Sequence, residues 1–126
     1  MSIYVEKEEA VTYQDVLLGP QYSNIKSRQE VNIGNHLSQD IDLELPLISS
    51  PMDTVSGSEM AAAMSQNGGV SVIHRYNSIE EQAKLVAAVS HEHTVGAAIG
   101  ATGDYAERAH ELVLAGVDFL CIDVAH

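Results

Sequence analysis

Polar side chains follow four short apolar runs of the chain, and their types suit the binding of a polar ligand. Ser49 and Ser50 come at the end of the first run, Arg75 follows the second and Asp123 follows the fourth. A carboxylate can accept hydrogen bonds from ribose hydroxyls, and a guanidinium can bind an anionic group. Serine hydroxyls can donate to a phosphate or a base. The residues are therefore candidates for a ligand site.

Several residues in the same segments also have an ordinary structural explanation. Asp53, which follows the first run, could accept hydrogen bonds from ribose hydroxyls as Asp123 could, or it could be the cap of a helix. Cys121 lies inside the fourth apolar run, where a buried structural thiol is the simpler interpretation. His91 and His93 lack further residues at the spacing of metal ligands, so we expect no metal site.

The four apolar runs predict four β-strands, which would position the polar residues that follow them. They cover residues 45–49, 70–73, 95–99 and 119–122. Each run is nearly continuous, which indicates strands buried on both faces. Between them, helical patterns cover residues 58–66, 78–90 and 104–115. The second helix opens with a Ser78-Ile-Glu-Glu81 capping box, and Asp104 is a possible cap for the third.

The strand starts fall about 24–25 residues apart, which predicts a repeated β-α unit and a parallel sheet. A doubly wound open sheet and a (β/α)8 TIM barrel share this spacing. No G-x-G-x-x-G motif follows the first strand, which favours the barrel. A complete barrel needs roughly 200–250 residues. We therefore expect an α/β fold that corresponds to the N-terminal half of a barrel, with four βα units over residues 45–126. An extended lead over residues 1–44 precedes it and includes a short strand near residues 30–33.

Composition excludes several classes of function. The chain has 126 residues with 6 basic and 18 acidic side chains, a formal charge of -12, so we expect no binding to nucleic acid. One cysteine excludes an internal disulfide framework and fits a reducing compartment. The N-terminal residues lack the pattern of a signal peptide, and no apolar stretch has the roughly 20 residues of a membrane span. We expect a cytoplasmic protein that binds no membrane.

Four stretches, in order, resemble the IMP dehydrogenase/GMP reductase family. The most specific is Leu45-Pro-Leu-Ile-Ser-Ser-Pro-Met-Asp-Thr-Val55, which is similar to the family's first barrel strand and loop. The others begin at Thr12-Tyr-Gln-Asp, at Gly68-Gly-Val-Ser-Val-Ile-His-Arg75 and at Val95-Gly-Ala-Ala-Ile-Gly100, the last followed by Ile122-Asp-Val-Ala-His126. Together they extend over about residues 11–126.

The resemblance implies redox chemistry on a purine nucleotide. In the dehydrogenase a cysteine attacks IMP, hydride passes to NAD and water releases XMP, whereas the reductase uses NADPH to convert GMP to IMP. By the same resemblance, Ser50, Met52 and Arg75 are expected to contact the nucleotide. Asp123 is expected to bind the nicotinamide ribose, and Thr102 is a second candidate for cofactor binding. A monovalent cation would be held by residues outside this chain.

Features of both enzymes occur in the chain. Regulatory CBS domains, which most IMP dehydrogenases carry, have no room between Val89 and Val95, and this is typical of GMP reductase. The segments Ser49-Ser-Pro-Met-Asp53 and Ala125-His126 are more similar to the dehydrogenase. We expect a dehydrogenase without CBS domains, with GMP reductase as the alternative.

The family's nucleophilic cysteine lies on a later loop, so no residue of this chain is assigned a catalytic role. We expect the chain alone to be inactive and to need the remainder of the barrel or a second chain, in an assembly that the family generally forms as a homotetramer. The other alternative is a non-enzymatic half-barrel that associates with itself or with a partner.

Overall fold

The computed structural model describes residues 11–125, which form two compact units divided between Val31 and Asn32. Within the described part of the first unit, regular structure consists of the 3-10 helix η1 (Arg28–Glu30). The strand predicted near residues 30–33 is wrong, because the Ser27 hydroxyl accepts a hydrogen bond from the Gln29 amide and caps this turn instead. The first ten residues of the predicted lead lie outside the described residues, and its boundary at residue 44 stays a prediction.

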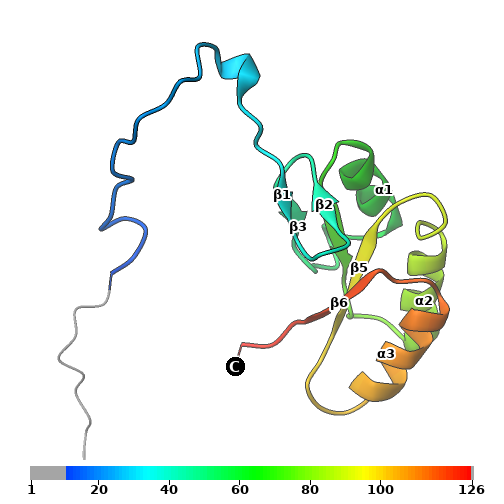
Figure 1. Ribbon diagram of the computed structural model, residues 1–126. Coiled ribbons are helices and arrows are strands. Elements are labelled where there is room, and N and C mark those ends of the chain that lie inside the picture. The colour runs from blue at the N-terminus through cyan, green and yellow to red at the C-terminus, as the bar shows by residue number, and fades with distance from the viewer. Residues whose placement is uncertain (1–10, 126) are drawn as a thin grey trace, which may run out of the picture. The chain divides into compact units, whose positions relative to one another are not determined.

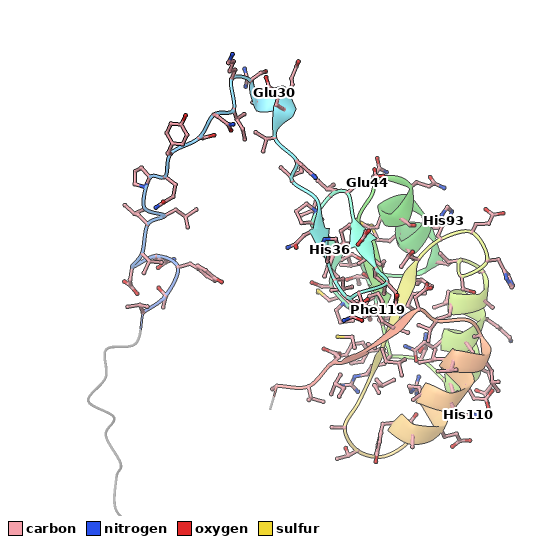
Figure 2. All side chains as sticks on the ribbon, viewed as in Figure 1. Glu30, His36, Glu44, His93, His110 and Phe119 are labelled. Atoms are coloured by element: carbon pink, nitrogen blue, oxygen red, sulfur yellow. The ribbon has the colours of Figure 1, made fainter. Side chains whose placement is uncertain are left out.

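The second unit opens with an antiparallel hairpin of β1 (Asn35–His36) and β2 (Asp42–Leu43). The His36 ring nitrogen Nδ1 lies 2.5 Å from Oδ1 of Asp42, across the hairpin, and His36 is labelled in Figure 2. Leu43 is buried and anchors the hairpin in the second unit.

Four parallel strands form the main sheet, in the order β3 (Ile48–Ser49), β4 (Val70–Ile73), β5 (Val95–Ile99) and β6 (Phe119–Ile122). The predicted α/β class and the parallel sheet are confirmed. Closure into an eight-stranded barrel stays a prediction. The first strand begins three residues later than the apolar run, because Pro46 has no amide hydrogen for the ladder.

Burial differs between the middle and the edges of this sheet. Every residue of β4 and β5 is buried, as predicted for strands covered on both faces. Residues of β3 and β6 are half-buried or exposed, which the sequence did not predict. The reason is their place at the sheet edges, where a strand has a neighbour on one side only.

Three helices alternate with the strands, as predicted: α1 (Ser58–Gln66), α2 (Ile79–Ala87) and α3 (Tyr105–Leu114). Side chains from all three pack in one core with alternate residues of β5, namely Val95, Ala97 and Ile99. Since alternate residues of a strand point to one face, the helices cover the same face of the sheet (Figure 1). Helices on one face suit a partial barrel, whereas a doubly wound sheet has helices on both faces.

The helix caps predicted from the sequence are confirmed in part. The capping box of α2 is confirmed, with the Glu81 amide donating to the Ser78 hydroxyl at 3.2 Å and the Ser78 amide donating to Glu81 at 3.0 Å. Asp104 is the N-cap residue of α3, but its carboxylate bonds to Arg108 rather than to helix amides. Asp53 is not a cap, because Gly57 holds that position for α1.

Within residues 11–125, no helix combines the length and the apolar character that crossing a membrane requires.

Candidate functional site

The residues predicted to bind ligands follow the carboxyl ends of the four parallel strands. Ser50 and Met52 follow β3, Arg75 follows β4, Thr102 follows β5 and Asp123 follows β6. Because parallel strands end at one edge of their sheet, these segments share that edge, where α/β folds bind their ligands. The individual roles of these residues stay predictions.

Arg75 and Asp123 contact each other directly, although β5 separates their strands. Nε of Arg75 lies 3.3 Å from Oδ2 of Asp123, and Nη2 donates to the Asp123 carbonyl oxygen at 2.9 Å. Nη1 lies 3.7 Å from the point where a side chain at Gly100 would begin, so the guanidinium extends over the end of β5. The Arg75 guanidinium also lies 5.5 Å from the centre of the Tyr76 ring. The guanidinium thus joins the ends of β4 and β6.

Asp123 keeps acceptor capacity for a ligand in this arrangement. Within residues 11–125, the hydrogen bonds of its side chain engage Oδ2 and leave Oδ1 open. The side chain is 30% exposed, so a ligand hydroxyl can reach it. A carboxylate oxygen accepts hydrogen bonds from vicinal hydroxyls, which fits the ribose contact that the sequence predicts.

Ser50 and Met52 lie in a turned segment, residues 50–56, which we call the strand-end loop. Ser50 is exposed, and Met52 is 51% exposed. The loop is closed by backbone hydrogen bonds from the amides of Met52 to Ser50 (2.8 Å), Val55 to Met52 (3.0 Å) and Ser56 to Met52 (2.9 Å). A ligand can therefore reach both side chains, and hydrogen bonds within the loop hold its backbone in this conformation.

The neighbouring Ser49 does not offer its hydroxyl to a ligand. Its Oγ lies 2.7 Å from Oγ of Ser56 and 2.6 Å from Oγ of Ser71, and the last two residues are fully buried. The suggestion that Ser49 could donate to a phosphate or a base is therefore wrong. The alternation of side chains along β3 turns this hydroxyl inward while Ser50 faces solvent.

Thr102 forms no hydrogen bond with the other predicted residues in the part of the chain that the structure describes. It is exposed in the turn between β5 and α3, beside Gly103, whose φ of +72° is in the left-handed region. Within the described residues its side chain takes part in no hydrogen bond. The structure therefore leaves Thr102 available without joining it to Arg75 or Asp123.

A buried polar network beneath the site was not foreseen from the sequence. The Gln82 amide nitrogen donates to the carbonyls of Ile73 (3.3 Å) and Ala98 (2.9 Å), near the ends of β4 and β5. Its oxygen accepts from Nη1 of Arg108 at 2.8 Å, and Gln82 is fully buried. The sequence does carry a sign of this network, because Gln82 is a polar residue on the same helix face as the apolar residues Val86 and Val89.

In the part of the chain that the structure describes, no three His, Cys, Asp or Glu side chains gather closely enough to hold a metal ion. Cys121 lies within β6 and is half-buried rather than fully buried, because β6 is an edge strand.

Comparison with known proteins decides the family. The family profile described as "IMP dehydrogenase / GMP reductase domain" matches residues 10–126. The chain belongs to this family. The IMP dehydrogenase/GMP reductase family consists of purine-nucleotide oxidoreductases.

Proteins named inosine-5'-monophosphate dehydrogenase and proteins named GMP reductase are both similar to the chain. Inosine-5'-monophosphate dehydrogenase of Nitrosopumilus maritimus is 43% identical over 91 residues, which cover 72% of this chain and 19% of the relative. GMP reductase of Leishmania donovani is 46% identical over 78 residues, 62% of this chain and 16% of the relative. Inosine-5'-monophosphate dehydrogenase of Bifidobacterium longum is 39% identical over 111 residues, 88% of this chain and 19% of the relative. Each match thus covers less than a fifth of the relative.

Proposed function

We propose that this chain is part of an NAD-dependent IMP dehydrogenase, which oxidises IMP to XMP in the synthesis of guanine nucleotides. The observation that carries the proposal is the Arg75–Asp123 contact, which joins a nucleotide-binding candidate to the cofactor-binding candidate at one sheet edge. IMP dehydrogenases also predominate among the similar proteins.

The chain's own residues bind and orient in this proposal. Ser50 and Met52 hold the nucleotide from the strand-end loop, and Arg75 faces the nucleotide from the end of β4. The open Oδ1 of Asp123 accepts hydrogen bonds from the nicotinamide ribose, and Thr102, on the loop that follows β5, is a second residue for the cofactor. Holding both ligands at one edge favours the reaction by proximity. NAD, when bound, would accept the hydride that leaves C2 of the purine.

The chemical step requires groups from outside these 126 residues. The one cysteine, Cys121, is part of β6, so we assign the nucleophile and the phosphate site to another segment or chain. That partner is the remainder of the barrel or a second polypeptide, in a cytoplasmic homotetramer that includes a monovalent cation site elsewhere.

GMP reductase is the alternative that a specific observation favours. The chain runs from Val89 to β5 with no room for the regulatory CBS domains that most IMP dehydrogenases carry, which is typical of GMP reductase. In that case NADPH replaces NAD, and the same loops hold GMP.

Two assays separate these reactions. The protein as isolated from its host is mixed with IMP and NAD, or with GMP and NADPH, and the absorbance of the reduced nicotinamide is followed. Formation of XMP and NADH supports the dehydrogenase, whereas consumption of NADPH with GMP supports the reductase. If IMP and GMP neither react nor bind, a non-enzymatic half-barrel is the better description.

A further inference from the structure

We propose that Ser56 is a positioning residue that sets the strand-end loop for nucleotide binding. The inference rests on the proposed function, because it concerns the loop that carries Ser50 and Met52. Ser56 itself is fully buried and cannot reach a ligand. It acts through the polar groups that surround it.

All three polar groups of Ser56 bond to segments of the candidate site. Its hydroxyl donates to the Ser50 carbonyl at 2.5 Å, and its amide donates to the Met52 carbonyl at 2.9 Å. Its own carbonyl accepts from the amide of His74 at 3.3 Å, next to Arg75. Ser56 thus connects both predicted nucleotide contacts in the loop to the segment that follows β4.

The serine hydroxyls around Ser56 form a chain of hydrogen bonds, and the donor of each bond can be assigned. A serine hydroxyl has one proton, and a carbonyl oxygen can only accept. Since Ser56 donates to Ser50, the contact between Ser49 and Ser56 must have Ser49 as donor. Ser71 must then donate to Ser49. The protons run from Ser71 through Ser49 and Ser56 to the Ser50 carbonyl.

This direction predicts a graded effect of removing each hydroxyl. Ser56→Ala removes the bond to the loop carbonyl. Ser49→Ala leaves that bond in place but removes its donor partner, which weakens it through lost polarisation, and it also leaves the buried Ser71 hydroxyl without its acceptor. Ser71→Ala leaves both of these bonds intact. Ser71 is as buried as Ser56 and the same atom is removed, so Ser71→Ala is the matched control.

Amide hydrogen exchange on the 126-residue chain tests the positioning without requiring a ligand. In Ser56→Ala we expect the amides of Met52 and Val55 to exchange about fivefold faster, the effect of losing one hydrogen bond of average strength. The amides of β5 should keep their rates. Ser49→Ala should give a smaller loop effect, and Ser71→Ala almost none.

Titration with IMP on the assembled protein as isolated from its host, in wild-type and variant form, tests the nucleotide role. We expect Ser56→Ala to weaken IMP binding about fivefold, in proportion to the loop opening, while Ser71→Ala leaves affinity within about twofold. Faster loop exchange with no IMP binding by any variant would overturn the proposed function and the nucleotide role of the loop. IMP binding with equal loop exchange in Ser56→Ala and Ser71→Ala would overturn the positioning role alone.

A purely structural role for Ser56 predicts a different result. Exchange would then rise in β5 as much as in the loop, which would also overturn the proposal. If Ser56→Ala does not fold, Ser56→Thr and Ser56→Val replace it, because the two side chains share a shape and differ by the hydroxyl. The proposal then requires a protected loop in the Thr variant and an open loop in the Val variant, and equal protection contradicts it.

Discussion

Arg75 reaches across the end of β5 to bond both the carboxylate and the backbone carbonyl of Asp123, 48 positions later in the chain. Two contacts from one guanidinium fix the position of the segment after β6 relative to the segment after β4. Because both side chains are about 30% exposed, the ion pair adds little stability, and its main effect is orientation.

We expect Asp123→Ala to affect the cofactor far more than the nucleotide. Loss of a charge-assisted hydrogen bond to the ribose should weaken NAD binding about tenfold or more, while IMP affinity changes less than about twofold. Calorimetric titration of each ligand measures this. Asp118→Asn is the control, since its carboxylate bonds the Val95 amide at the opposite end of the strands. Equal losses for both ligands would count against the ribose role.

The ion pair itself can be measured by a double-mutant cycle. Arg75→Ala and Asp123→Ala, alone and together, should give a coupling free energy of about 0.5 kcal/mol in urea unfolding. Arg75→Lys should retain part of the charge attraction but lose the second bond, because Lys lacks the forked donors of Arg. A coupling energy of several kcal/mol would show that the pair is a main stabilising contact.

Gln82 should be among the most sensitive positions for stability. Gln82→Leu leaves Nη1 of the buried Arg108 without its acceptor and removes the donor to the carbonyls of Ile73 and Ala98, so we expect a loss of about 3 kcal/mol. Denaturation by urea gives the free energy of unfolding. Gln66→Leu, at an exposed position of α1, is the control and should change it by less than about 0.5 kcal/mol.

Gly96 should not tolerate a side chain, because Phe119 occupies the space beside it. The two residues are register partners in β5 and β6, and a methyl group at Gly96 would overlap the Phe119 ring, which is labelled in Figure 2. We expect Gly96→Ala to cost about 2 kcal/mol. A second change, Phe119→Leu, should restore part of that loss. Gly100→Ala is the control, since a methyl group there meets only ordinary contacts.

Asp104 makes the stability of α3 depend on acid pH. The hydrogen bonds from Arg108 hold the pKa of the Asp104 carboxyl below its ordinary value of 3.8. A carboxyl whose pKa is lower in the folded chain stabilises the fold above its unfolded pKa, and this contribution disappears as the pH falls through the folded pKa. Melting temperatures of the wild type and Asp104→Asn should therefore differ at neutral pH, begin to converge as the pH falls below 3.8, and meet only below the lowered pKa of the folded chain. A constant difference across this range would contradict the assignment.

Activity of the isolated chain is a further test. We expect no XMP from IMP and NAD with the purified 126-residue protein, because its cysteine is part of β6. Product analysis by chromatography gives the result. Turnover by this chain alone would require a nucleophile among the residues described above.

Features that depend on local chemistry were predictable from the sequence. The hydrogen bonds of the Ser78 capping box join residues within a segment of four residues. The apolar run of β5 is continuous in the sequence, and every residue of this strand is buried. The position of the candidate residues at the strand ends followed from the repeated β-α spacing. Such features need no knowledge of which distant segment they meet.

Features that depend on distant partners were not predictable in the same way. Ser56 obtains its role from Ser49 and from a loop carbonyl, and Gln82 obtains its role from two strands and another helix. A short strand was predicted near residues 30–33, yet the local cap at Ser27 decides the conformation. Tertiary contacts and one competing local hydrogen bond account for these differences.

The order of the parallel strands in space is their order along the chain, and this has a consequence for synthesis on the ribosome. Each of β4, β5 and β6 pairs with the strand made just before it. A newly made strand therefore finds its partner already outside the exit tunnel, and the sheet can grow by one βα unit at a time. Pairing between consecutive strands also closes shorter loops than pairing with more distant strands would, which keeps the entropy cost of each step lower.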